Sequence, residues 1–309
     1  MLLLRKLKFS LAQQFWMAMY QKLSEYMDFI KIEHTLFALP FAYTGAFLAA
    51  GGWFGFKIFI LILIAFTGLR TAAMSLNRII DRDIDALNPR TANRHIPAGR
   101  ISLKEAYSIV FFSLAVYFIS AYLLNETAFL LSPIPAITAW IYPYLKRYTC
   151  FSHYVLGLNL AYAPGGGWVA VTNSANIFGN EFIPFMIGVA LVFWVAGFDI
   201  IYALQDVEFD KRYKLHSIGA HFGVNVAKAV SALNHIIFFA ISLYILVFYI
   251  GGKALIVGMS FIALILLFEH YIIRKGYGEK RIQLAFFYSN ALISSVFLGS
   301  ILLNVILKI

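Results

Sequence analysis

Residues 182–204 read FIPFMIGVALVFWVAGFDIIYAL, an apolar run in which Asp199 is the one charged residue. A hydrocarbon layer about 30 Å thick is crossed by roughly 20 helical residues, so this run is long enough to span a bilayer. Runs of similar length and character lie on both sides of it. The helices are expected at about 33–52, 56–76, 106–124, 127–145, 153–172, 182–204, 226–249, 253–273 and 285–307. The predicted fold class is therefore all-α, a polytopic membrane bundle of about nine transmembrane helices.

The composition of the 309-residue chain agrees with a membrane protein. Hydrophobic residues make up 61% of the chain and charged residues only 13%, about half the ~25% charge of soluble domains. This balance excludes a soluble globular enzyme, and an aromatic content of 17% argues against disorder. The single cysteine, Cys150, excludes a disulfide framework and a cysteine-based metal site.

The placement of Lys and Arg predicts the orientation of the bundle. Most of the 25 basic residues fall on one side if the N-terminus is cytoplasmic, as the positive-inside rule requires. This placement accounts for the net positive charge of the chain, so no nucleic-acid partner is needed to explain it. Residues 1–30 do not form a convincing signal peptide, and their mixture of aromatic, Met and Lys residues predicts an amphipathic helix on the cytoplasmic interface. Residues 31–309 are expected to form a single transmembrane domain.

Two short acidic stretches stand at the predicted cytoplasmic ends of helices. In the first, Asn77, Asp81 and Asp85 are spaced four residues apart; in the second, Asp206 and Asp210 repeat that spacing. Side chains four positions apart share one helical face, where like charges repel and need a compensating cation. Salt bridges to nearby Arg and Lys would supply one. Oxygen-only donors favour Mg²⁺, which commonly binds carboxylates together with substrate phosphates, so two Asp pairs bridged by a diphosphate are the preferred interpretation.

Two further charged residues, Asp199 and Arg70, fall inside predicted membrane helices. Ionisable groups at such positions are rare and are functional hypotheses by default. The seven His residues show no metal-ligand spacing and are expected to be structural or solvated.

Several of these segments carry a family resemblance. It rests on five segments: Asn77 to Asp85, Asn88 to Gly99, Tyr142-Pro-Tyr-Leu-Lys-Arg147, Asp199 to Ser217, and Thr35-Leu-Phe-Ala-Leu-Pro-Phe41. Through them the chain resembles, from about residue 30 to 300, the UbiA superfamily of intramembrane prenyltransferases, in its 4-hydroxybenzoate polyprenyltransferase branch. The first and fourth segments are similar to the two Asp-rich motifs of that family.

The resemblance implies an enzyme that transfers a polyprenyl group from an allylic diphosphate to an aromatic acid, by diphosphate ionisation and electrophilic aromatic substitution. The implied cofactor is Mg²⁺, with the ligands Asn77, Asp81, Asp85, Asp206 and Asp210. The implied diphosphate-binding cations are Arg82, Arg94, Lys146, Arg147 and Lys214. Three residues are expected to act on the reacting groups: Tyr142 near the allylic cation, Asp199 as base or orienter, and Arg70 toward an acceptor carboxylate or a motif carboxylate.

The aromatic acceptor stays open between two quinone pathways. Many family members carry an Arg-x-Asp pair where this chain has Lys31-Ile-Glu33. The segment Glu33-His34-Thr35 resembles the corresponding segment of a menaquinone-pathway subgroup. The acceptor is therefore either 4-hydroxybenzoate, for ubiquinone, or a dihydroxynaphthoate, for menaquinone. The expected partners are these substrates and the lipid bilayer, without nucleic acid. The expected location is a bacterial inner membrane, with the active site facing the cytoplasm.

An ion-coupled secondary transporter is the rival interpretation, because it also requires intramembrane carboxylates. The paired acidic spacings lie at the membrane edge on one side, next to basic loops, and this placement suits phosphate and metal chemistry better.

Overall fold

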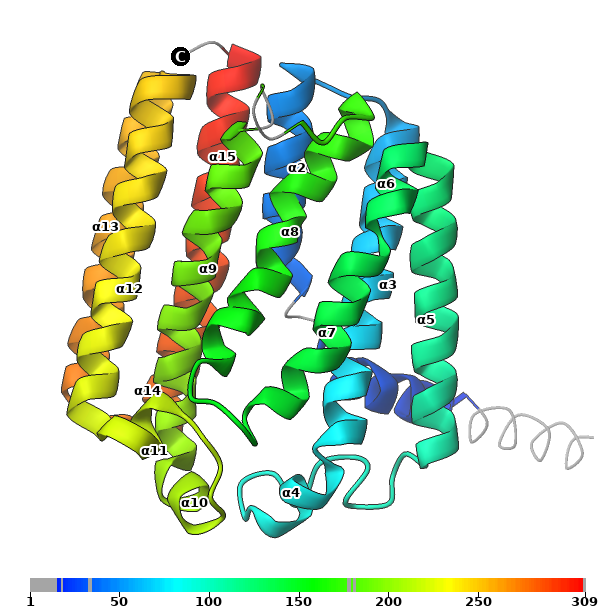
Figure 1. Ribbon diagram of the computed structural model, residues 1–309, viewed down its shortest axis with the longest axis vertical. Helices are drawn as coiled ribbons and strands as arrows, with labels where there is room; N and C mark the ends of the chain where they lie inside the picture. The colour runs from blue at the N-terminus through cyan, green and yellow to red at the C-terminus, as the bar shows by residue number, and fades with distance from the viewer. Residues whose placement is uncertain (1–15, 18, 33–34, 177–178, 180–181, 308–309) are drawn as a thin grey trace, which may run out of the picture.

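The computed structural model describes residues 16–17, 19–32, 35–176, 179 and 182–307, and within them the regular structure is entirely helical. The first half of the chain contains α2 (Thr35–Ala50), α3 (Phe56–Ile80), α4 (Arg82–Leu87), α5 (Leu103–Leu124), α6 (Glu126–Leu131), α7 (Pro133–Leu145) and α8 (Ser152–Thr172). The second half contains α9 (Phe182–Ala203), η2 (Leu204–Asp206), α10 (Val207–Arg212), α11 (Ile218–Phe222), α12 (Val224–Ile245), η3 (Leu246–Ile250), α13 (Lys253–Arg274), α14 (Glu279–Gln283), η4 (Leu284–Ser289) and α15 (Asn290–Leu307). Figure 1 shows the long helices side by side as a bundle.

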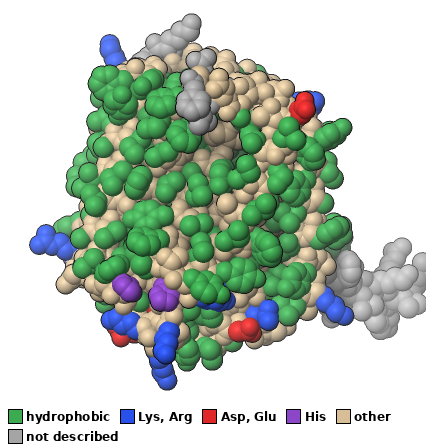
Figure 2. Space-filling model, viewed as in Figure 1, with side chains coloured by type: hydrophobic (Ala, Val, Ile, Leu, Met, Phe, Trp, Pro, Cys, Tyr) green, Lys and Arg blue, Asp and Glu red, His purple; other side chains and the backbone are tan. Residues whose placement is uncertain are grey.

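The predicted membrane-bundle class is confirmed. Within the described residues, seven helices are long and apolar enough to cross a membrane, while α2 contains a shorter apolar segment, Ala38–Ala50. Hydrophobic side chains cover most of the face shown in Figure 2, and charged side chains gather mainly at the end where α4, α10 and α11 lie. Each predicted apolar run contains a helix, but the count of nine spans and the orientation of the N-terminus stay predictions.

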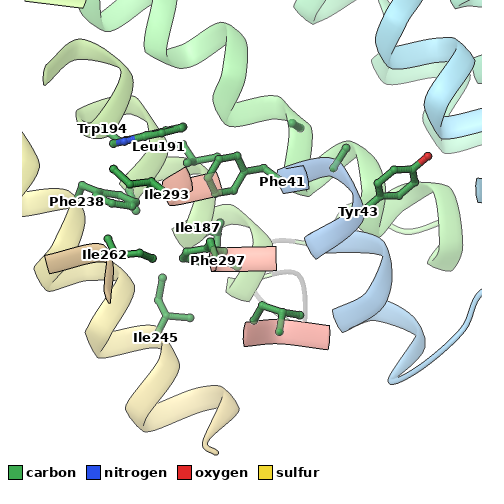
Figure 3. Packing of buried hydrophobic residues seen from close by; sticks show 14 of the residues in the cluster. Phe41, Tyr43, Ile187, Leu191, Trp194, Phe238, Ile245, Ile262, Ile293 and Phe297 are labelled. Atoms are coloured by element: carbon green, nitrogen blue, oxygen red, sulfur yellow. The ribbon is translucent and has the colours of Figure 1, made fainter. Parts of the chain in front are cut away.

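Helix α9 is central to the bundle and presents the second acidic stretch. It packs against α8 on one side and α12 on the other, and 67% of its apolar window is buried. The Trp194 ring lies 5.2 Å from Phe41 of α2 and 5.8 Å from Phe238 of α12, between ring centroids (Figure 3). Aromatic contacts of this kind stabilise a core beyond the area they bury. They hold α9 in place above its charged end.

Helices α2 and α8 approach each other at backbone distance. A Cβ atom added to Gly167 would lie 1.8 Å from the carbonyl oxygen of Ala42, so only glycine fits there. Gly165 and Gly166 differ, because a Cβ atom on either would meet no neighbouring atom within 4 Å. Gly167 therefore allows α2 and α8 to pack closely, whereas Gly165 and Gly166 leave space inside the bundle.

A helix over residues 19–30 precedes α2 and lies against the start of α5. Its Lys22 Nζ is 3.2 Å from Glu105, the Tyr26 hydroxyl donates to the same carboxylate at 2.9 Å, and Phe29 is fully buried. Tyr20 and Leu23 point outward and are exposed. This helix is amphipathic, while its contact with a membrane surface stays a prediction. Residues 1–15 and 18 of the expected interfacial segment, and Glu33 and His34, lie outside the described residues.

Candidate active site

The two acidic stretches lie at the same end of the bundle. Helix α3 ends at Ile80, and Asp81, with φ −92° and ψ 0°, separates it from α4; the second stretch continues from α9 through η2 into α10. Figure 1 shows α4 and α10 next to each other. The stretches are in direct contact, because Asn88, just after α4, donates from Nδ2 to Asp206 Oδ1 at 2.8 Å.

Arg90 makes a second link between the two stretches. Its Nε donates to Asp206 Oδ1 at 2.9 Å, its Nη2 pairs with Oδ2 of the same carboxylate, and its Nη1 donates to the Tyr202 hydroxyl at 3.1 Å. Burial alone would lower the pKa of Arg90, but the hydrogen bond to Asp206 raises it on balance. Such a fork of charge-assisted hydrogen bonds is a strong link. It ties the loop after α4 to the end of α9.

Asp81 is the most deeply buried carboxylate of the first stretch, with 2% of its surface exposed. Lys146 Nζ lies 2.6 Å from its Oδ2, and Arg147 Nη2 lies 3.3 Å from its Oδ1. Asn77 Nδ2 is 3.4 Å from Oδ2. Burial raises the pKa of Asp81, and the nearby Lys146 ammonium opposes this effect. Oδ1 is buried and accepts no hydrogen bond.

The remaining acidic residues also have partners. Arg94 Nη1 donates to both oxygens of buried Asp85, at 2.7 and 2.8 Å. The Ser217 hydroxyl donates to Asp210 Oδ2 at 2.7 Å. Cations from the loops therefore contact three of the four aspartates with the predicted spacing, namely Asp81, Asp85 and Asp206.

The predicted cations divide into two groups. Arg94, Lys146 and Arg147 contact the carboxylates of the first stretch. Arg82 instead pairs with exposed Asp83 at 3.4 Å and donates to the Ile79 carbonyl, and Lys214 is exposed just after α10 with φ 55°. Arg90 was not among the predicted diphosphate-binding residues, although it stands in the loop that carries part of the family resemblance.

A second layer of polar residues lies further into the bundle. His153 Nδ1 is 2.7 Å from Asp199 Oδ2. Tyr142 is close enough to Asp199, Asp81 and Arg70 to interact with their charges. The histidines are expected to be structural or solvated; His153 is one of the buried ones, and it contacts Asp199, a predicted catalytic residue. Spacing along one helix could not reveal this pair, because 46 positions separate its members.

An apolar pocket of about 480 Å³ lies within the bundle. It lies between α2, α3 and α5 to α9, and extends from Leu69, the neighbour of Arg70, to Ala175 and Phe185. Gly165 and Gly166 form part of its wall. A pocket with so few polar groups suits a hydrocarbon chain.

The acidic residues fit a hard divalent cation by their chemistry. Asp81, Asp85, Asp206 and Asp210 supply only oxygen, the donor that Mg²⁺ prefers, and buried Asp81 Oδ1 has no hydrogen-bond donor. In the part of the chain that is described, no three His, Cys, Asp or Glu residues are arranged so that they could hold a metal ion together. A metal ion held by these carboxylates would therefore need further oxygen ligands from a bound substrate.

A membrane helical bundle with a charged end and an apolar pocket is the class of protein that the fold and the site define. The chain belongs to the UbiA prenyltransferase family, whose sequence pattern matches residues 38–291. The predicted family and the predicted prenyltransferase class are thereby confirmed.

Relatives of known name and structure agree with this membership. The chain is 29% identical to a 4-hydroxybenzoate octaprenyltransferase of Actinobacillus pleuropneumoniae serotype 5b (strain L20), over 69% of this chain and 71% of the relative. It is 30% identical to a protein of the same name from Haemophilus ducreyi, over 71% and 76%.

Solved structures show the same fold. An apo UbiA homologue from Aeropyrum pernix K1 is 36% identical with a TM-score of 0.80, covering 88% of this chain and 98% of that one. A UbiA homologue from Archaeoglobus fulgidus, bound to GPP and Mg²⁺, is 22% identical with a TM-score of 0.70, covering 90% and 99%. At that identity, the second structure shows a shared fold alone.

Proposed function

We propose that this enzyme transfers a polyprenyl group from an allylic polyprenyl diphosphate to a ring carbon of 4-hydroxybenzoate, with Mg²⁺ as cofactor. The observation that carries the proposal is that cations contact the aspartates of both acidic stretches at one end of the bundle, where Arg90 reaches Asp206 and Lys146 reaches Asp81. Carboxylates that lie beside cations at one end of the bundle suit a metal–diphosphate substrate. The names of the relatives support the acceptor, and the GPP- and Mg²⁺-bound homologue supports the donor and the metal.

Diphosphate binding follows from an exchange of partners. The cations that now neutralise the aspartates are Lys146, Arg147, Arg94 and Arg90. An arriving diphosphate competes for these cations, and the released carboxylates become available to a metal. The residues that would hold Mg²⁺ are Asn77, Asp81, Asp85, Asp206 and Asp210. When bound, the ion offsets the negative charge that develops on the departing diphosphate. Arg82, next to Asp81 in the chain, and Lys214, four residues after Asp210, would add to the positive field at this end of the bundle.

The apolar pocket would hold the polyprenyl tail. Its lining runs from Leu69, next to Arg70 in the chain, past Gly165 and Gly166 into the bundle. In this proposal the allylic end of the tail lies at the Leu69 end, toward Tyr142. An aromatic ring beside an allylic cation stabilises it by about 0.5–2 kcal/mol.

The aromatic acid would bind between the two acidic stretches and the apolar pocket. Arg70 would pair with its carboxylate, and Asp199 would take the proton that the ring loses after the new carbon–carbon bond forms. Because the reaction joins a water-soluble acid to a lipid tail, we place the site at the cytoplasmic face of a bacterial inner membrane. The asymmetry of Lys and Arg supports that orientation.

A product assay tests the proposed function. The purified protein in lipid nanodiscs receives a labelled polyprenyl diphosphate and either 4-hydroxybenzoate or a dihydroxynaphthoate. We expect a prenylated product with 4-hydroxybenzoate only, loss of product with EDTA, and recovery when Mg²⁺ is added in excess. Product with the naphthoate alone would overturn the acceptor and place the enzyme in menaquinone synthesis. Absence of product with both acids, together with cation-driven solute flux, would favour the secondary transporter.

A further inference from the structure

His153 and Asp199 form a buried pair whose two ends differ in exposure. The His153 side chain is 5% exposed and the Asp199 side chain 17%, so the pair opens on the carboxylate side. His153 Nε2 is buried and has no hydrogen-bond partner. A proton on Nε2 would need an acceptor in that position, and burying it without one costs free energy. The imidazole therefore carries its proton on Nδ1 and donates it to Asp199 Oδ2.

The backbone near Asp199 is fixed from the opposite side. Ser231 of α12 donates to the Gly197 carbonyl at 2.8 Å. The His235 ring packs so closely on Gly197 that an added Cβ atom would lie 2.3 Å from its Cδ2. Helix α12 thus fixes the main chain of α9, and α8 fixes the carboxylate through His153. This support from two helices is what a precisely aimed functional group requires.

We infer that His153 is a positioning residue for Asp199. By holding Oδ2, it presents Oδ1 to the aromatic acceptor beside Tyr142. The inference rests on the proposed function, in which Asp199 is the base. It adds a residue outside both acidic stretches and outside the predicted site.

The proton balance of the step is complete with these groups. The allylic carbon–oxygen bond breaks, and its electron pair leaves with the diphosphate. A ring carbon of the acceptor bonds to the allylic carbon, and the hydrogen on that ring carbon passes to Asp199 Oδ1 as a proton. Its bonding pair restores the aromatic ring. The Nδ1 proton of His153 stays on the imidazole throughout and keeps the carboxylate oriented.

Two variants of His153 distinguish positioning from simple packing. In His153→Asn the side-chain amide places its NH₂ where Nδ1 stands, whereas in His153→Gln the amide lies further out, near the Nε2 position. We expect His153→Gln to lower kcat by on the order of 10–100-fold, as is usual when a residue that orients a functional ligand is lost. His153→Asn should keep kcat within a few-fold of wild type. KM for the prenyl diphosphate should stay unchanged in both.

A double-mutant cycle completes the test. In an Asp199→Asn background, His153→Gln should cause no further loss, because the two residues act as a unit. Equal losses in the Asn and Gln variants, or additive losses in the double variant, would overturn the inference. If a His153 variant does not fold, Asp199→Glu takes its place, because this variant keeps the carboxylate but displaces it from His153. An unchanged kcat in Asp199→Glu would also overturn the inference. Wild-type protein that makes no product would instead refute the proposed function.

Discussion

Replacement of Asp81 by Asn is expected to lower kcat/KM for the prenyl diphosphate by about 10²–10³-fold, the usual cost of removing one preorganised electrostatic group from an active site. Asp81 is buried between Lys146 and Arg147, and its pKa is raised by that burial. The variant keeps the shape of the side chain but removes a proposed metal ligand. It also leaves the Lys146 ammonium without its carboxylate. Steady-state kinetics at saturating acceptor measure the effect.

Asp83 provides a matched control two residues away. Its side chain is 81% exposed and pairs only with Arg82 at 3.4 Å among the contacts of the described residues. Asp83→Asn should therefore change kcat/KM by less than about two-fold, as for surface substitutions in general. A loss of equal size in both variants would show that general loss of negative charge at this end of the bundle, and not a metal site at Asp81, controls activity.

Gly165→Phe is expected to change the length of polyprenyl chain that the enzyme accepts. Gly165 lines the apolar pocket, and an added side chain there meets open space and no neighbouring helix. The phenyl ring should fill the pocket without unfolding the bundle. The ratio of kcat/KM for a forty-carbon donor to that for a ten-carbon donor should fall by about 10²-fold, the scale on which apolar pockets discriminate by size.

The control for this prediction is Gly299→Phe in α15. Gly299 also has open space around its Cβ position, but it does not line the pocket. Its substitution should leave the chain-length ratio unchanged. If Gly165→Phe slows both donors equally, the pocket does not hold the tail. Thermal unfolding of both variants in detergent checks that each is folded.

The sequence alone predicts the helices and the existence of a charged end. Apolar runs such as residues 182–204 and 226–249 are unambiguous because a membrane helix needs about 20 such residues. The four-residue spacing of Asn77, Asp81 and Asp85 likewise requires only local geometry.

Contacts between distant segments are beyond such reasoning. Arg90 and Asp206 are 116 positions apart, and their pairing depends on how the loop after α4 folds back over the end of α9. Arg82, by contrast, has local contacts in this structure, to Asp83 and to the Ile79 carbonyl. Only the tertiary fold therefore identifies Arg90 as a member of the site.

The central claim, that the two acidic stretches form one metal–diphosphate site, is tested most directly by metal binding. Mn²⁺ titration followed by electron paramagnetic resonance, with and without inorganic diphosphate, reports the site without turnover. Because cations occupy Asp81, Asp85 and Asp206 in this structure, diphosphate should raise Mn²⁺ affinity by at least about 10-fold beyond its own chelation, within the usual range of coupling between sites. The Asp81→Asn variant should lose this increase. Mn²⁺ affinity that is the same with and without diphosphate, or unchanged in the variant, would contradict the account.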